Sequence, residues 1–182
     1  AVRDPGVEFT VEAGRPDCID DEKLSLLKEA GVTRICVNPQ TFHDKTLVLL
    51  GRKHTVRDIL EKYESARKFG FSVNMDLIAG LPGESLEDFR ASVDKAADLS
   101  PDNVTVHTLS LKKGSRLKES VDRLPDGEIG VMIDYSAEKL LSSGYEPYYL
   151  YRQKNTLENL ENIGFAKEGK ESLYNIFCLL YT

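Results

Sequence analysis

The fold is decided by residues 72–85, which read SVNMDLIAGLPGES. Residues 72–78 are a run of mostly apolar and β-branched side chains, and this run predicts a buried strand. A Gly-Leu-Pro-Gly turn follows, and Ser85 and Asp88 then match the capping box that begins a helix. A strand that passes through a tight turn into a helix is the repeating unit of an α/β protein.

The same unit extends outward from this stretch in both directions. Segments rich in β-branched or aromatic residues predict further strands at residues 7–13, 34–38, 103–109 and 147–151. Apolar residues at helical spacing predict helices at residues 20–30, 55–69, 85–99 and about 128–143. Because strands alternate with crossover helices, we expect an α/β fold with parallel strands and outer helices.

The ends of the predicted helices carry local signals. Thr55 and Asp58 match a second capping box, three residues apart like the first. Gly31 and Gly70 follow the first two helices, at the position where a left-handed residue commonly ends a helix. These signals place the helix boundaries within a few residues.

Composition indicates one globular domain with few anionic partners. The chain has 182 residues, a mass of 20.4 kDa and 41% hydrophobic side chains, which are enough to bury a core. The net charge of −6 and the pI near 5.2 argue against general binding of nucleic acid or of an anionic membrane. The apolar runs are shorter than the roughly 18 residues of a membrane span, and no signal peptide is recognisable. We therefore expect a cytoplasmic protein without nucleic-acid or membrane partners.

The cysteines and histidines do not form a recognisable metal motif. Cys18, Cys36 and Cys178 lack the short spacing of metal ligands, so we interpret them as reduced thiols without a special role. The nucleotide-binding glycine motifs, the zinc-protease motif and the nucleophile elbow are all missing. A zinc site is a minor alternative, since the three histidines can meet only through the fold; they are His43, His54 and His107.

Polar residues gather where the predicted strands end. Because the carboxyl ends of parallel strands meet at one edge of a sheet, such residues are the first candidates for a binding site. The candidates are Glu12, Gln40, Asp76, His107, Thr108 and Ser110, with Arg52 just before the second long helix. A guanidinium binds a carboxylate, while carboxylates and amides accept hydrogen bonds from ribose hydroxyls or an ammonium. These groups together suit an amino-acid-bearing nucleoside, although each residue alone fits an ordinary surface or strand-end group.

Four runs in this order carry a family resemblance: EFTVEAGRPD (residues 8–17), RICVNPQTF (34–42), LGRKHT (50–55) and MDLIAGLPGE (75–84). Together they resemble the radical S-adenosylmethionine oxygen-independent coproporphyrinogen III oxidases. The runs NPQ, VHTL and YLYRQKN, which begin at residues 38, 106 and 149, are most similar to the coproporphyrinogen dehydrogenase branch.

The resemblance implies a partial (βα) barrel of which this chain holds the later strands only. Residues 1–145 would be the later part of the barrel, and residues 146–182 would begin the C-terminal, substrate-side extension. The family's Cys-x3-Cys-x2-Cys loop, which holds a [4Fe-4S] cluster, and its glycine-rich segment have no counterpart here. We therefore expect a fragment that supplies no metal ligand.

The resemblance also implies a role for each site residue. Glu12 would contact the S-adenosylmethionine bound at the cluster, and Gln40, Arg52 and Asp76 would contact a second S-adenosylmethionine. Ser110 falls at a further contact position. These roles agree with the ligand chemistry derived above.

The implied reaction is the radical oxidative decarboxylation of the propionates of coproporphyrinogen III to vinyl groups, which gives protoporphyrinogen IX in haem biosynthesis. The electron donor is unknown. Cationic candidates for the propionates are Lys112, Lys113, Arg116, Arg152 and Lys154.

Three alternatives stay open: a haem-binding, chaperone-like relative, another radical enzyme, and an inactive barrel remnant. We expect no catalysis by the isolated chain, and we expect self-association through an exposed edge strand.

Overall fold

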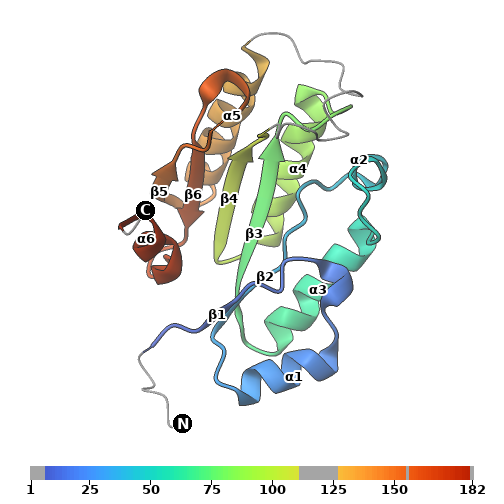
Figure 1. The fold of residues 1–182 in the computed structure, drawn as a ribbon, viewed down its shortest axis with the longest axis vertical. Helices are drawn as coiled ribbons and strands as arrows, with labels where there is room; N and C mark the ends of the chain where they lie inside the picture. The colour runs from blue at the N-terminus through green and yellow to red at the C-terminus, as the bar shows by residue number, and fades with distance from the viewer. Residues whose placement is uncertain (1–6, 111–126, 155, 181–182) are drawn as a thin grey trace.

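A computed structural model describes residues 7–110, 127–154 and 156–180, and the side chains of residues 178–180 are not described. Its centre is a six-stranded sheet in the order β1-β2-β3-β4-β6-β5 (Figure 1). The strands are β1 (Thr10–Val11), β2 (Arg34–Cys36), β3 (Ser72–Ala79), β4 (Asn103–Thr108), β5 (Glu146–Tyr151) and β6 (Asn162–Ala166). Strands β1 to β4 are parallel to one another, as predicted.

The helices occupy the predicted places, with short additions between them. They are α1 (Asp21–Glu29), α2 (Asp44–Leu49), α3 (Val56–Lys68), α4 (Leu86–Leu99), α5 (Glu128–Ser142) and α6 (Leu173–Leu180), with 3-10 turns η1 (Pro16–Cys18) and η3 (Leu157–Asn159). Both capping boxes form, at Thr55 with Asp58 and at Ser85 with Asp88. Gly31 and Gly70 have φ of 80° and 73°, the left-handed conformation expected after α1 and α3.

The sheet departs from the prediction at its C-terminal side. Strand β6 was not predicted, because it follows a polar segment and is short, and it pairs antiparallel with both β4 and β5. The expectation of parallel strands alone was therefore wrong for β6. Strand β1 spans two residues instead of the predicted seven of residues 7–13. Helices α2 and α6 were also missed; α2 is too short for a periodic apolar pattern to be recognised.

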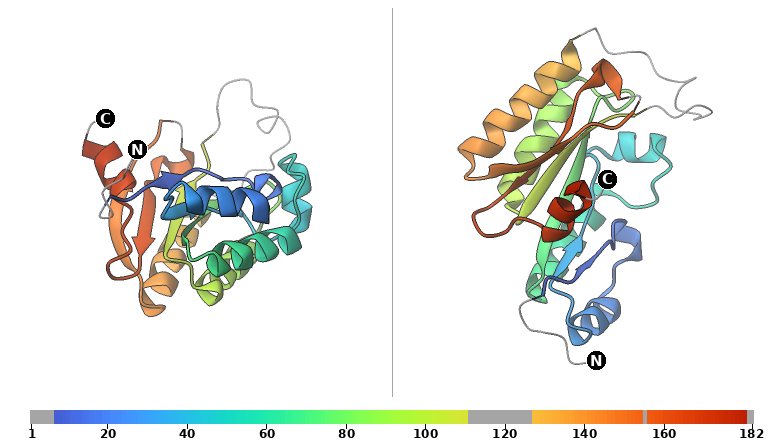
Figure 2. Two further views of the ribbon diagram at one scale, coloured as in Figure 1. Left: turned by 90° about the horizontal axis from the view of Figure 1, so that it is seen from below. Right: turned by 60° about the vertical axis from the view of Figure 1, so that its left-hand side comes forward.

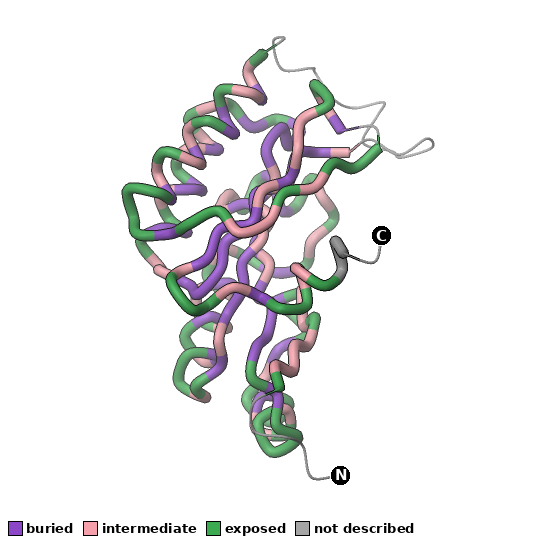
Figure 3. Tube along the Cα trace, turned by 90° about the vertical axis from the view of Figure 1, so that its left-hand side faces the viewer, coloured by how far each residue is buried: buried purple, intermediate pink, exposed green. Residues whose placement is uncertain are grey.

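The two faces of the sheet differ in chemistry. One face, which we call the outer face, carries apolar side chains such as Val73, Leu77 and Val106 and packs against α1, α3, α4 and α5. Figures 1 and 2 show α4 and α5 on this side and α6 on the other. Buried residues are concentrated in the strands, and exposed residues follow the outer sides of the helices (Figure 3). The outer face is thus the hydrophobic core.

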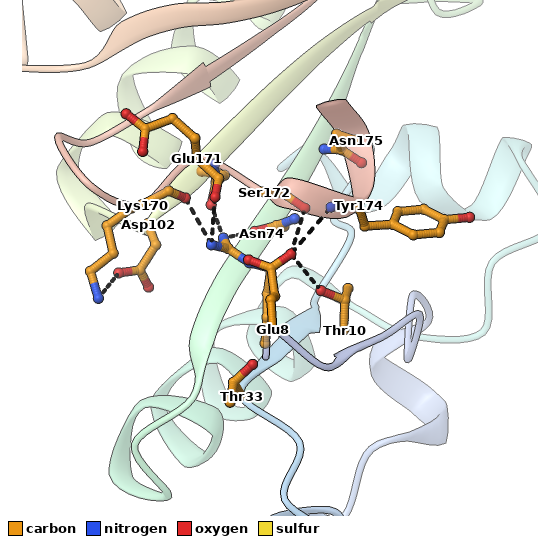
Figure 4. A network of polar contacts seen from close by, with 12 residues as sticks. Glu8, Thr10, Thr33, Asn74, Asp102, Lys170, Glu171, Ser172, Tyr174 and Asn175 are labelled. Atoms are coloured by element: carbon orange, nitrogen blue, oxygen red, sulfur yellow. Dashed lines mark hydrogen bonds and ion pairs between the residues drawn. The ribbon is translucent and has the colours of Figure 1, made fainter. Parts of the chain in front are cut away.

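The opposite, inner face of the sheet is polar, and Arg34 bonds at its amino end to a network that includes Glu8, Asn74 and Lys170. Figure 4 shows these three partners. The Arg34 guanidinium donates to Asn74 Oδ1 at 2.8 Å, to Asn103 Oδ1, and to the carbonyl of Lys170 at 2.8 Å. Its Nε also pairs with Glu8 Oε2 at 3.2 Å. Through Arg34 on β2, which also bonds to β3 and β4, the segment before α6 is attached to the amino end of the inner face. The carboxyl end of this face remains available for a site.

Among the described residues, no helix combines the length and the apolar character that crossing a bilayer requires.

Candidate functional site

The carboxyl end of the inner face places a thiol beside two carboxylates. Cys36 Sγ on β2 lies 3.4 Å from Glu12 Oε1, just past the end of β1, and donates to it. Burial raises the pKa of the Cys36 thiol, and the nearby charges of Glu12 and Asp76 raise it further. The structure therefore places Glu12 and Asp76 on the two sides of β2, around Cys36, a residue to which the sequence analysis assigned no role.

The row continues from Asp76 across β4 to β5. His107 Nε2 lies 3.7 Å from Asp76 Oδ2, and His107 Nδ1 lies 3.4 Å from the Tyr151 hydroxyl. Asp76 and His107 are both about one quarter exposed, so a ligand can reach them from the inner face. The sequence analysis placed His107 among the candidates at the strand ends; its link to Asp76 depends on the pairing of β3 with β4.

Gln40 is locked to β3 through its backbone. Its N–H donates to the carbonyl of Asp76 at 2.9 Å, and its own carbonyl accepts from the N–H of Ile78 at 3.0 Å. Gln40 has φ of 67°, a left-handed conformation that is uncommon for a residue with a side chain. The predicted candidates Gln40 and Asp76 are thus adjacent, and the strained backbone at Gln40 is held by β3.

A buried carboxyl group ties this loop to the Gly-Leu-Pro-Gly turn. Glu84 is 3% exposed, and its Oε1 accepts a hydrogen bond from Thr41 Oγ1, which neighbours Gln40. Burial raises the pKa of Glu84, although bonds from Thr41 and Thr46 oppose the shift. Glu84 was quoted in the motif without a role; a charged residue between a tight turn and an N-cap is the signal that could have identified it.

The raised pKa of Glu84 predicts a pH-dependent stability. The folded state holds the proton more tightly than the unfolded state, whose carboxyl has a pKa near 4.5. The free energy of unfolding therefore falls as pH rises from about that value through the folded-state pKa. Glu84→Gln should remove this loss and stabilise the chain at pH 7, with little effect near pH 4. Urea unfolding at both pH values measures the difference.

Glu87→Gln is the matched control, because the Glu87 side chain is 75% exposed at the start of α4, three residues after Glu84. This variant should change stability little at either pH. Equal effects of the two substitutions at pH 7 would mean that Glu84 ionises without a cost from burial.

Arg52 lies between α2 and α3, where its N–H donates to the carbonyl of Leu47 at 2.9 Å. Its half-buried side chain forms no hydrogen bond or ion pair with any residue that the structure describes. Nearby, His54 is buried with Nδ1 3.5 Å from Asp17 Oδ1. Burial lowers the pKa of His54; the charges of Arg52 and Arg15 lower it further, and Asp17 opposes them. Arg52 therefore sits near the loop after β1 but not in contact with the row of Glu12 and Asp76.

Among the candidates that the structure describes, Ser110 follows the carboxyl end of β4. Ser110 Oγ donates to the carbonyl of Lys154 at 2.9 Å, and Ser110 also forms a bridge with Thr156. The candidates Lys112, Lys113 and Arg116 lie outside the described residues. Arg152 is exposed and pairs with Glu161. Ser110 is thus not brought into contact with Glu12 or Asp76 in the described part of the chain.

The three histidines have separate surroundings: His43 Nε2 lies 2.8 Å from the carbonyl of Asp88, His54 lies near Asp17, and His107 near Asp76. Across the ranges that the structure describes, no three His, Cys, Asp or Glu side chains are grouped to hold a metal ion. The zinc alternative therefore receives no support from these residues.

Comparison with known proteins assigns the fold and the family. The model of the radical SAM superfamily matches residues 2–96, which hold β1 to β3 with Glu12, Gln40 and Asp76. The chain belongs to the radical SAM superfamily. The structure of "Coproporphyrinogen III oxidase (HemN) from Escherichia coli" covers 91% of this chain with a TM-score of 0.73 and 23% identity, which confirms the radical SAM α/β fold.

Two curated relatives are similar in sequence to this radical SAM chain. The "Oxygen-independent coproporphyrinogen-III oxidase-like protein HemZ" of Bacillus subtilis is 45% identical over 94% of this chain, and the "Heme chaperone HemW" of the same organism is 33% identical over 93%. The chain spans only 35% and 43% of their respective lengths and 36% of the HemN chain.

Radical SAM proteins use S-adenosylmethionine and a [4Fe-4S] cluster, and the described residues fit only the first. The carboxylates of Glu12 and Asp76 are accessible acceptors on the inner face, and Arg52 is a cation without a described partner, so the donor set suits the hydroxyl, ammonium and carboxylate groups of that nucleoside. Cys36 is buried against Glu12, Cys18 is exposed elsewhere, and neither belongs to a metal-binding group among the residues described. The chain's described part therefore offers no place for the cluster.

Proposed function

We propose that this chain is part of a cytoplasmic oxygen-independent coproporphyrinogen III oxidase of the dehydrogenase type. It would convert propionates of coproporphyrinogen III to vinyl groups and so form protoporphyrinogen IX in haem biosynthesis, with cluster ligands that come from outside these 182 residues. The observation that carries the proposal is the row of Glu12, Cys36 and Asp76 at the carboxyl end of a radical SAM sheet. The names of the HemZ and HemN relatives support the choice of substrate.

In this proposal the chain's own residues bind and orient the cofactor. Glu12 would accept hydrogen bonds from one S-adenosylmethionine, whereas Gln40, Arg52 and Asp76 would hold a second one, with Ser110 nearby. S-adenosylmethionine with a reduced cluster supplies a carbon-centred radical for hydrogen abstraction. The protein's contribution is geometry, because hydrogen abstraction needs a propionate held within reach and water kept away.

We also propose a division of the chain. Residues 1–145 would complete the barrel, and residues 146–182 would begin the substrate-side extension. In the structure β5 and β6 belong to the same sheet as β1 to β4. The proposed boundary therefore separates two proposed functions, cofactor binding and substrate binding, and does not coincide with a break in the sheet. Of the proposed propionate partners in the described part of the chain, Lys154 is exposed and has no described side-chain ion pair.

A second candidate function is haem binding without oxidation of coproporphyrinogen, which the resemblance to the heme chaperone HemW favours. The two functions give different products. Incubation of the complete, cluster-loaded protein with coproporphyrinogen III under anaerobic conditions should yield protoporphyrinogen IX if the oxidase proposal is right. Tight haem binding with cleavage of S-adenosylmethionine but no such product would favour the chaperone, and a different product would indicate another radical enzyme.

Arg52→Ala tests the proposed cofactor site. In the complete protein it should weaken binding of S-adenosylmethionine by about 1.5–3 kcal/mol, the range for hydrogen bonds to charged groups, or roughly 10- to 100-fold in Kd. A fully buried pair would lose more, but Arg52 is only half-buried. Equilibrium dialysis with labelled cofactor measures the change.

Arg57→Ala serves as the control for Arg52, because Arg57 is exposed and pairs only locally with Glu61. Its Kd should equal that of the wild type. If Arg52→Ala also leaves Kd unchanged, Arg52 is an ordinary surface charge.

A further inference from the structure

We infer that His107 is a positioning residue for Asp76, and that Tyr151 determines which nitrogen of the His107 ring faces Asp76. The three side chains come from β4, β3 and β5 and form a chain across the inner face. The inference rests on the proposed role of Asp76 in holding S-adenosylmethionine, and it adds a residue to which that role was not assigned.

His107 on β4 faces Asp76 on the neighbouring strand β3. His107 Nε2 lies 3.7 Å from Asp76 Oδ2, so one carboxylate oxygen faces the imidazole. This separation is slightly longer than a hydrogen bond, and such contacts at binding sites commonly shorten when a ligand binds. An N–H at Nε2 directed at that oxygen then restricts rotation of the carboxylate. The other carboxylate oxygen then keeps a constant direction in which it can accept a hydrogen bond from a ligand.

The other ring nitrogen of His107 faces Tyr151. His107 Nδ1 lies 3.4 Å from the hydroxyl oxygen of Tyr151, whose ring also meets the imidazole edge to face, with centroids 6.4 Å apart. Gln153 Nε2 donates to the same hydroxyl oxygen at 3.5 Å. The Tyr151 proton is therefore directed at Nδ1, which makes Nδ1 an acceptor and leaves the N–H of the ring on Nε2, toward Asp76.

Tyr151 is held in place by its contact with Tyr149. Its ring stacks on Tyr149 with an interplanar angle of 15° and a centroid distance of 6.0 Å. The Tyr149 ring in turn lies directly over Gly164, and its hydroxyl is 2.9 Å from Thr105 Oγ1 on β4. Burial raises the pKa of the Tyr151 hydroxyl, which therefore remains a proton donor at neutral pH. These contacts hold the Tyr151 side chain in place, so that its hydroxyl can orient the imidazole of His107.

A packing role does not account for His107. The ring lies on the polar inner face, it is one quarter exposed, and it is not part of either apolar cluster. A phenylalanine would fill the same space and keep the edge-to-face contact with Tyr151. What it would lose is the pair of ring nitrogens, so substitutions that separate shape from hydrogen bonding can test the inference.

The test measures the Kd of S-adenosylmethionine in the complete, cluster-loaded protein. His107→Phe should raise Kd about fivefold, the size of a modest coupling between contacting residues. His107→Gln keeps an N–H donor near the Nε2 position and should return Kd to within about twofold of the wild type. In an Asp76→Asn background His107→Phe should have no further effect, because His107 acts through Asp76. Arg57→Ala is the unaffected control.

Three results would overturn the inference: an unchanged Kd in His107→Phe, no recovery in His107→Gln, or equal effects of His107→Phe with and without Asp76. Failure of the wild-type protein to bind S-adenosylmethionine would instead contradict the proposed function. Nitrogen-15 spectra of histidine-labelled protein then decide the inference separately. His107 should carry its proton on Nε2 and become a mixture of tautomers in Tyr151→Phe; a spectrum unchanged by that substitution would contradict it.

Discussion

Replacing Arg34 with leucine is expected to lower the free energy of unfolding by about 3–5 kcal/mol, the cost of removing one partner from a buried ion pair. The Arg34 side chain is 5% exposed and pairs with Glu8, which is 16% exposed. The substitution removes the donor to Glu8 Oε2 and to the side-chain oxygens of Asn74 and Asn103, while Glu8 Oε1 keeps its other hydrogen bonds. It also detaches the carbonyls of Lys170 and Glu171, so the segment before α6 loses its attachment to β2. Urea unfolding followed by circular dichroism gives the free energy.

Two controls separate charge and geometry in this network. Arg57→Leu removes a guanidinium that is 86% exposed and should change stability by less than about 0.5 kcal/mol. Arg34→Lys keeps the charge but lacks the planar fork of five donors, and should fall between the wild type and Arg34→Leu. If Arg34→Leu costs no more than Arg57→Leu, the network does not hold the inner face together.

The second large effect is expected at Gly164, where alanine should destabilise the chain by about 3 kcal/mol, the upper part of the usual range for overpacking. A Cβ at this position would lie 1.7 Å from Cε1 of Tyr149, which is too close for any pair of carbon atoms. The ring cannot move away easily, because its hydroxyl is held near Thr105 and it stacks on Tyr151. Unfolding in urea, followed by tyrosine fluorescence since the chain has no tryptophan, measures the loss.

Removing the ring should relieve the clash. The double variant Gly164→Ala with Tyr149→Ala should be more stable than the sum of the two single effects predicts, because the alanine methyl then has space. Gly130→Ala, where a Cβ would meet Glu158 at an ordinary 3.7 Å inside α5, should be neutral or slightly stabilising. Strictly additive effects of Gly164→Ala and Tyr149→Ala would contradict the steric explanation.

Helices and their ends could be predicted from the sequence because their signals are local. The capping boxes at Thr55 and Ser85 involve residues three positions apart, and both form. Strand β6 could not be predicted in the same way. Its pairing with β4 joins residues about sixty positions apart, such as Asn103 and Ala166, and its own short stretch carries no distinctive pattern.

The candidate site also contains residues that could be predicted from the sequence and contacts that could not. The rule that parallel strands end at one edge placed Glu12, Gln40 and Asp76 together, and in the structure all three lie at the carboxyl ends of β1 to β3. The role of Cys36 between the carboxylates, and the contact of Glu84 with Thr41, could not be seen in advance. Those contacts depend on strand register and on how loops pack across each other.

The βα order, the helix boundaries, the family and the edge of the sheet at which the polar residues gather could all be predicted from the sequence, because hydrophobic period, capping and motif spacing are properties of neighbouring residues. Which of these residues touch depends on the three-dimensional fold. The link from Asp76 through His107 to Tyr151 requires β3, β4 and β5 to be placed in one sheet in a particular register. A shift of one residue in that register would turn each side chain to the other face, and this is why the site follows from the folded chain alone.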